Sequence, residues 1–194
     1  PYEYGIYLFE INFPDNYPFE PPKVKYLTND GKMRFNPNFY INGKVCLSVL
    51  NTWQGDGWTS CQSIYSICLI LLERFNENPL INEPGINKEN IMVNKYNILV
   101  NYKNFEFSIY KQLSIISNLD KELISSDFKT IYDNSNRHYK TLLIFNNEIK
   151  QHIKLNYSNI LKKLDSSECE LENKLADKLA DKLADKLADK LADK

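Results

Sequence analysis

All eight prolines and all six glycines of this 194-residue chain lie within residues 1–85, and residues 86–194 contain neither. Proline and glycine punctuate strands and turns and are disfavoured inside helices. The distribution therefore predicts a first part that is rich in strands and loops, followed by a part that is mainly helical.

Two strands are predicted near the start of the chain. Residues 4–13 are rich in β-branched and aromatic side chains, and residues 23–27 alternate between polar and apolar. Between them, residues 14–22 carry four prolines and cannot form a helix or a central strand. A third, short strand is predicted at residues 33–35, and residues 36–60 are expected to be mostly irregular.

A buried helix is predicted at residues 62–75, where apolar side chains recur at helical spacing. Ser63 or Gln62 is its expected cap. Within this segment we expect Cys68 to lie in the core and Cys61 to be a loop thiol. The helices predicted after the polar loop at residues 76–85 cover residues 90–117, 120–133 and 136–164.

The last part of the chain is a low-complexity repeat. Residues 174–194 are five copies of Lys-Leu-Ala-Asp followed by a lysine. A leucine at every fourth position drifts about 40° per repeat around a helix, so it forms no fixed apolar seam. We expect an exposed, partly helical tail, with a partner-binding helix as the alternative.

Charge and cysteine usage exclude several classes of protein. The chain has 24 basic and 25 acidic residues, which gives no indication of nucleic-acid or electrostatic membrane binding. No apolar run reaches the ~18 residues of a membrane-spanning helix. The four cysteines form no CxxC pair and no zinc-like Cys/His pattern, so a reducing compartment, cytoplasmic or nuclear, is the expected location.

The segment with the clearest chemical signal is Asn36-Pro37-Asn38-Phe39-Tyr40-Ile41-Asn42-Gly43-Lys44-Val45-Cys46-Leu47. A single thiol, Cys46, follows a rigid proline and an Asn-Gly turn, a pattern typical of a presented nucleophile rather than a core cysteine. Neither histidine, His138 or His152, is near in sequence. A cysteine hydrolase, which needs such a base, therefore has no local support.

Three further motifs lie on either side of that segment. Together, in this order, the four resemble the catalytic core of ubiquitin-conjugating enzymes. The Asn-Pro-Asn sequence in place of the commoner His-Pro-Asn resembles a subgroup of larger members with a helical C-terminal extension. The resemblance implies an α+β fold in which a small antiparallel sheet packs on helices. The three motifs are Phe13–Val24 with its Tyr-Pro-Phe and double proline, Trp53–Ser63, and Asn76–Gly85.

Members of this family begin with a helix and two strands before the position that matches Pro1. These elements have no counterpart in the printed sequence. We expect either a fragment of a longer protein or a degenerate copy, with an exposed sheet edge and a reduced core. The expected division is a conjugating core at 1–110, a helical extension at 111–164 and the repeat tail at 165–194.

The resemblance implies roles for four residues in catalysis. Cys46 would be the nucleophile, and Asn38 would order the loop and stabilise an oxyanion, a contribution of about 3 kcal/mol. Tyr40 and Glu83 would lie beside an incoming lysine and help it lose a proton. The alternatives are a structural thiol at Cys46, a turn asparagine at Asn38 and a solvated loop carboxylate at Glu83.

The resemblance also implies a ligase-facing surface. Phe19 matches the loop residue that inserts into RING-type ligases, with a packed loop aromatic as the alternative. A second loop, with Trp58 and Ser60, would face the same partner, although it has Thr-Ser-Cys where the family usually has Ser-Pro-Ala. Trp53 and Trp58 are both expected to anchor the long loop on the core.

The function implied is that of a ubiquitin or ubiquitin-like carrier. It would accept the modifier from an activating enzyme as a thioester on Cys46 and pass it to a lysine of a substrate protein, with or without a RING-type ligase. It would require no cofactor and no metal. The alternative is a non-catalytic binding module of the same fold, or a fragment that cannot be charged.

Overall fold

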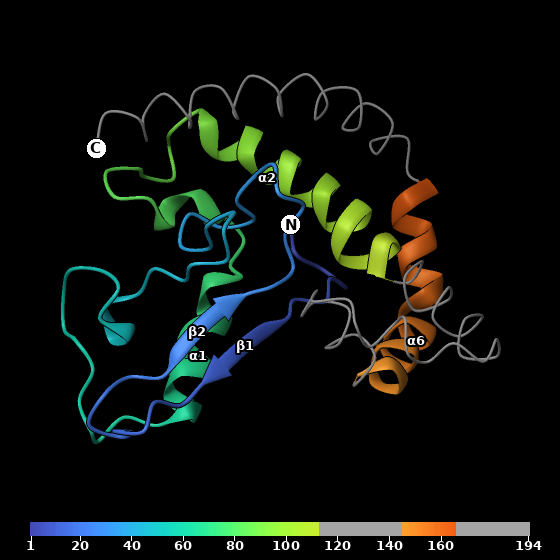
Figure 1. Ribbon diagram of the computed structural model, residues 1–194. Helices are drawn as coiled ribbons and strands as arrows, with labels where there is room; N and C mark the ends of the chain where they lie inside the picture. Colours follow the sequence, from blue (N-terminus) through green and yellow to red (C-terminus); the bar gives the residue numbers. More distant parts are fainter. Residues whose placement is uncertain (113–144, 166–194) are drawn as a thin grey trace.

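The computed structural model describes residues 1–112 and 145–165, and its fold is α+β, as the resemblance implied (Figure 1). A two-stranded sheet lies against helix α1, and the longer helical segments lie at the other end of the molecule. The elements in chain order are β1 (Phe9–Asn12), β2 (Lys23–Tyr26), the 3₁₀ turn η1 (Ser48–Leu50), α1 (Ile64–Arg74), the 3₁₀ turn η2 (Pro79–Asn82), α2 (Met92–Lys103), the π-helix η3 (Asn104–Lys111) and α6 (Asn146–Asp165).

Strands β1 and β2 pair antiparallel, in a register that places Phe9 opposite Tyr26 and Asn12 opposite Lys23. The prolines of residues 14–22 make the connection a series of turns, as predicted. The Gly43 carbonyl accepts the Tyr26 amide at 2.8 Å, so the sheet holds the turn that leads to Cys46.

The predicted strand at residues 4–13 is too long, because the backbone before β1 forms other hydrogen bonds. The Ile6 amide donates to the Ser108 carbonyl at 3.2 Å, in the π-helix. The Leu8 amide donates to the Thr28 hydroxyl at 2.8 Å. These two amides are therefore unavailable to a ladder with β2. The Leu8 carbonyl still accepts the Leu27 amide at 2.9 Å, and the regular pairing begins at Phe9.

The predicted strand at residues 33–35 is wrong. Asp30 turns the chain at this point, since one of its carboxylate oxygens accepts the amides of Lys32 at 2.9 Å and Met33 at 3.0 Å. Such local side-chain bonds to the backbone compete with a sheet ladder. Phe35 is instead a fully buried core residue in an irregular segment.

Helix α1 begins where the sequence predicts, and Ser63 caps it. The Ser63 hydroxyl accepts the Ser66 amide at 3.5 Å, and the Ser66 hydroxyl accepts the Ser63 amide at 3.0 Å. This reciprocal arrangement is a capping box, and it satisfies two donors that the first turn would otherwise leave free.

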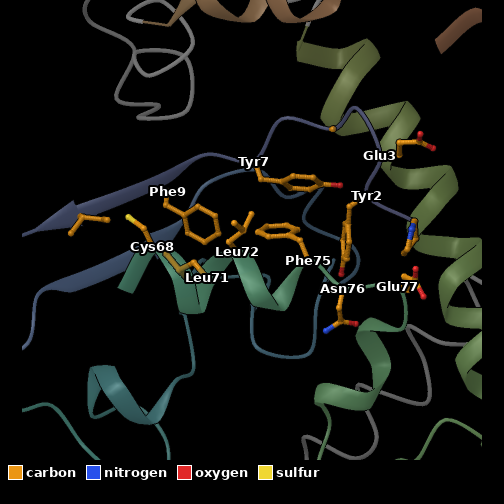
Figure 2. Close-up of a pocket in the computed structure, with 13 residues that line it drawn as sticks. Tyr2, Glu3, Tyr7, Phe9, Cys68, Leu71, Leu72, Phe75, Asn76 and Glu77 are labelled. Carbon is orange, nitrogen blue, oxygen red and sulfur yellow. The ribbon is translucent and has the colours of Figure 1, made fainter. Parts of the chain in front are cut away.

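Only one stripe of α1 is buried, so the prediction of a core position for Cys68 is wrong. Ile67 and Leu71 are buried, whereas Cys68 is exposed and Leu72 is 68% exposed. The exposed side chains line a groove of about 610 Å³ between α1 and the free edge of β1, with Phe9 on the opposite wall (Figure 2). Among the described residues, β1 has β2 as its only strand partner.

An aromatic cluster fills the space between the sheet, α1 and the loop that carries Cys46. The rings of Tyr26 and Phe39 stack with centroids 5.0 Å apart, and the Phe9 ring meets the Phe39 ring edge-on at 5.3 Å. Phe39 and Val45 are nearly inaccessible to solvent. The turn before Cys46 therefore rests on a packed core and is held in position by it.

The helix predicted at residues 90–117 is confirmed over its described part, but it widens into a π-helix. Asn104, at the start of η3, is fully buried and accepts the Tyr7 hydroxyl at 2.5 Å. Its amide nitrogen donates to the Glu3 carbonyl at 2.8 Å, and Gln112 donates to the Ile6 carbonyl at 2.6 Å. π-Helical turns are uncommon, and here the widened segment binds the start of the chain.

Helix α6 is the described part of the helix predicted at residues 136–164. Its buried residues Ile149, Ile153 and Ile160 form a cluster with Leu8 and with the π-helix. The helix predicted at 120–133 and the repeat at 174–194 lie outside the described residues. In the described part, no helix is both long enough and apolar enough to cross a membrane.

Candidate active site

Two consecutive turns build the loop that carries Cys46. In the first, the Phe39 amide donates to the Asn36 carbonyl at 2.9 Å. In the second, the Gly43 amide donates to the Tyr40 carbonyl at 2.9 Å. Gly43 has φ +88°, and a side chain there would lie 2.9 Å from the Tyr26 carbonyl, so this turn requires glycine.

Asn38 and Cys46 hold each other across this loop. The Cys46 amide donates to the Asn38 carbonyl at 2.9 Å, and the Asn38 Nδ2 donates to the Cys46 carbonyl at 2.9 Å. One side-chain N–H of Asn38 is thus used to hold the loop, and an amide nitrogen carries two. The second N–H takes no part in this bond.

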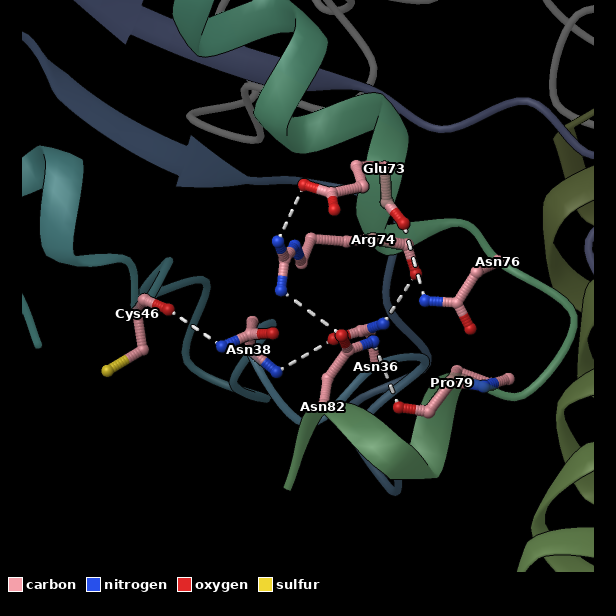
Figure 3. A network of polar contacts seen from close by, with 8 residues as sticks. All are labelled: Asn36, Asn38, Cys46, Glu73, Arg74, Asn76, Pro79 and Asn82. Carbon is pink, nitrogen blue, oxygen red and sulfur yellow. Dashed lines mark hydrogen bonds and ion pairs between the residues drawn. The ribbon is translucent and has the colours of Figure 1, made fainter. Parts of the chain in front are cut away.

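A buried polar network connects this loop to the end of α1 (Figure 3). Asn36 is fully buried; its Nδ2 donates to the Arg74 carbonyl at 2.8 Å and its Oδ1 accepts the Asn38 amide at 2.9 Å. Arg74 in turn donates to Asn82 Oδ1 at 3.1 Å, and Asn82 immediately precedes Glu83. The network therefore joins the Cys46 loop and the Glu83 loop to one helix end.

The four predicted catalytic residues come together. Asn38, Tyr40, Cys46 and Glu83 all line one small cavity of about 50 Å³. They come from two segments that lie almost forty positions apart, and the sequence alone could not show that these meet. The other residues that line the cavity are Pro37, Trp53, Asn82 and Pro84.

The sequence pattern predicts a presented thiol rather than a core cysteine at Cys46, and this is wrong, because the side chain is buried. Cys46 is 3% exposed, and its sulfur donates to the Thr52 carbonyl at 3.1 Å. Burial raises the pKa of the Cys46 thiol above its ordinary value, although Lys44 and a hydrogen bond with Tyr40 act in the opposite direction. The raised pKa favours the neutral thiol over the thiolate.

Two residues near Cys46 were not predicted as site residues from the sequence, Thr52 and Trp53. Thr52 received no prediction, although its position six residues after Cys46 was visible. Trp53 was expected to anchor the loop on the core, and this is wrong, because it is 51% exposed and lines the cavity beside Cys46. Trp58 does pack against the main core cluster.

Tyr40 lies under a cationic side chain. The Arg34 guanidinium carbon is 3.7 Å from the centre of the Tyr40 ring, and Arg34 also donates to the Pro37 carbonyl at 3.3 Å. Lys44 lies 5.7 Å from the same ring. Cation–π contact orients the Tyr40 ring and places positive charge beside it.

The residues predicted to face a ligase lie on two neighbouring loops. Phe19 is 82% exposed at the tip of the first loop. Trp58, in the second, donates its indole N–H to the Pro18 carbonyl at 2.7 Å and so joins the two loops. Ser60 is exposed two residues further on. In residues 1–112 and 145–165, no group of three or more His, Cys, Asp or Glu side chains is arranged to hold a metal.

This fold and this cysteine loop define a member of the ubiquitin-conjugating enzymes. The model of the ubiquitin-conjugating enzyme family matches residues 1–106, more than half of the chain. The chain therefore belongs to this family.

Three relatives show how the similarity is distributed. The human ubiquitin-conjugating enzyme E2 Z is 50% identical over 90 residues, which is 46% of this chain and 25% of that protein. The probable ubiquitin-conjugating enzyme protein 17 of Caenorhabditis elegans is 36% identical over 135 residues, 64% of this chain and 18% of that protein. The putative ubiquitin-conjugating enzyme E2 39 of Arabidopsis thaliana is 46% identical over 96 residues, 45% of this chain and 29% of that protein. The chain thus spans less than a third of the length of each relative.

Proposed function

We propose that this chain carries ubiquitin, or a ubiquitin-like modifier, as a thioester on Cys46 and transfers it to a lysine amine. The observation that supports this most strongly is the cavity shared by Cys46, Asn38, Tyr40 and Glu83. The modifier would come from an activating enzyme. A RING-type ligase would bind at Phe19, Trp58 and Ser60, and the substrates would be proteins.

Charging is a thiol exchange. The Cys46 sulfur gives up its proton and bonds to the carbonyl carbon of the modifier's C-terminus, and the bond from that carbon to the activating enzyme's cysteine breaks. The departing thiolate takes up a proton. Because the incoming thioester is already activated, a thiol that is mostly protonated at neutral pH is adequate.

Transfer to lysine uses the remaining groups of the cavity. The lysine nitrogen bonds to the same carbonyl carbon, and the second N–H of Asn38 would stabilise the oxyanion that forms. Glu83 would accept a proton from the attacking amine, and the Tyr40 ring would orient the lysine stem. The Cys46 sulfur then leaves as a thiolate and is reprotonated.

The chemistry proposed here needs no metal and no organic cofactor, since the activating enzyme supplies the energy of the thioester. We assign the chemistry to residues 1–110, describe 111–164 as a helical extension and give no catalytic role to the repeat tail at 165–194. The cysteines at 46, 61 and 68 are free, and a cytoplasmic or nuclear location is proposed for a protein that needs a reduced thiol.

A second candidate function is a non-catalytic binding module of the same family. The observation that favours it is the burial of Cys46, which is 3% exposed and whose thiol is hydrogen bonded to Thr52. In that case the chain would bind the modifier or a partner without a covalent step.

A charging assay separates the two. The chain is mixed with an activating enzyme, ATP and ubiquitin or ubiquitin-like modifiers, and the products are compared on reducing and non-reducing gels. We expect a band shifted by one modifier that thiol removes, that becomes thiol-resistant in Cys46→Ser, and that is unchanged in the matched control Cys61→Ser, which alters an exposed thiol. No band with any activating enzyme would contradict the carrier and favour the binding module.

A further inference from the structure

Thr52 is bonded to the three-residue segment around Cys46 by both its side chain and its backbone. Its hydroxyl donates to the Val45 carbonyl at 2.8 Å and accepts the Leu47 amide at 2.9 Å. Its own amide donates to the Leu47 carbonyl at 3.2 Å. The side chain thus fixes where the Thr52 carbonyl lies, which is 3.1 Å from the Cys46 sulfur.

The contact between sulfur and carbonyl depends on the thiol proton. A carbonyl oxygen can only accept a hydrogen bond, so the Cys46 sulfur must be protonated to make it. A thiolate or a thioester sulfur has no proton and would place lone pairs against the carbonyl oxygen at the same distance. The contact therefore stabilises one chemical state of Cys46, the free thiol, against both of the others.

We propose that Thr52 is a positioning residue that holds its own carbonyl over the Cys46 thiol, and that residues 51–53 move off the sulfur before a thioester forms there. The movement of residues 51–53 depends on the proposed function, because charging is the step in which Cys46 loses its proton. The sulfur's new bond to the modifier's carbonyl carbon replaces the S–H bond, and the activating enzyme's departing thiolate gains a proton. Trp53, which lines the cavity next to Thr52, would move with this segment.

Other charged and titratable groups face Cys46, and any test must leave them in place. Lys44 and Arg34 favour the thiolate through their positive charge, and Tyr40 favours it through a hydrogen bond. Glu83, which lines the same cavity, disfavours the thiolate. None of these groups belongs to the 51–53 segment, so a substitution at Thr52 keeps all four side chains in the protein.

The first test is the alkylation of Cys46 by iodoacetamide between pH 6 and 10, in a chain in which the cysteines at 61, 68 and 169 are serine. Thr52→Val keeps the volume of the side chain and removes its hydroxyl. We expect alkylation at pH 7 to become about threefold to tenfold faster, the range for loss of one hydrogen bond, with the midpoint of the profile at lower pH. Thr52→Ser should restore the original profile, and Thr59→Val, in the same loop, should leave it unchanged.

An unchanged rate and midpoint in a folded Thr52→Val chain would overturn the proposal, with folding checked by thermal unfolding. A second measurement keeps the native Thr52. Cys46→Ser retains a proton donor for the Thr52 carbonyl, whereas Cys46→Ala does not. We expect hydrogen exchange in residues 51–58 to be faster in Cys46→Ala than in Cys46→Ser, and equal rates would also overturn the proposal.

Neither measurement involves an activating enzyme, so the two proposals can fail separately. If alkylation and exchange behave as expected while no modifier is ever loaded, the carrier function is wrong and the Thr52 contact stands. If charging succeeds but Thr52→Val changes neither readout, the carrier function stands and the role of Thr52 is wrong.

Discussion

Replacing Asn36 by alanine tests whether the buried network holds the Cys46 loop. Asn36 is completely buried, and its single amide group bridges two segments. Its nitrogen donates to the Arg74 carbonyl at 2.8 Å at the end of α1, and its oxygen accepts the Asn38 amide at 2.9 Å in the loop. Alanine removes the amide nitrogen and oxygen of Asn36 together and supplies no new hydrogen-bonding group.

The expected cost follows from the two groups left behind. A buried backbone donor or acceptor without a partner costs about 1–3 kcal/mol. Asn36→Ala leaves the Arg74 carbonyl and the Asn38 amide without these partners, so we expect a loss of about 2–6 kcal/mol in the free energy of unfolding. Domains are typically stable by only about 5–15 kcal/mol, so this loss is large.

Guanidinium unfolding followed by tryptophan fluorescence measures this change. The matched control is Asn42→Ala, in the next turn of the same loop, where an exposed side chain accepts the Lys44 amide at 3.0 Å. We expect the control to change stability by only about 0.5 kcal/mol. If Asn36→Ala shifts the unfolding midpoint no further than Asn42→Ala, with equal slopes, the network does not hold the loop and the reasoning is refuted.

Two further predictions concern α1 and the buried lysine. Leu71→Ala should lower the free energy of unfolding by about 2–4 kcal/mol because Leu71 is buried. Leu72→Ala changes a side chain that is 68% exposed and should lower it by only about 0.5 kcal/mol. Equal losses, measured by chemical unfolding, would mean that the groove is closed in solution. Burial works against the charge of Lys103, but the carboxylates of Glu106 at 2.5 Å and Asp30 at 3.5 Å raise its pKa above the ordinary value. Lys103→Met should therefore lower the free energy of unfolding by about 2 kcal/mol at pH 7. The stability difference between the two proteins should decrease only as the pH rises past the ordinary lysine pKa of about 10.4. A stability difference that does not depend on pH would exclude an ionic cause.

Much of the fold was predictable because its signals are local. The prolines of residues 14–22, the Ser63 cap and the spacing of Ile67 and Leu71 act within a few positions along the chain. The error at residues 4–13 has a distant cause, since the backbone there bonds to the π-helix around Ser108, about a hundred positions away. No local pattern contains that information.

The candidate site divides in the same way. The contact between Asn38 and Cys46 was predictable because the turns that join them lie within one short segment. That Glu83 lines the same cavity was implied only by the family resemblance. Cys68 was placed in the core because helical spacing gives the apolar side of a helix but does not show whether another element covers it.

By itself, the sequence determined the order of β1, β2 and α1, a cap at Ser63 or Gln62 and the turns that lead to Cys46, because each depends on neighbours along the chain. Only the tertiary structure decided which stripe of α1 is buried, where β1 begins and which carbonyl faces the thiol. Those features depend on contacts between segments that the chain separates, and a hydrogen bond or a packed face exists only when both partners are brought together. Thr52 illustrates the difference. Its position in the sequence, six residues after Cys46, indicates no role, whereas the 3.1 Å distance from its carbonyl oxygen to the Cys46 sulfur supports the role proposed for it.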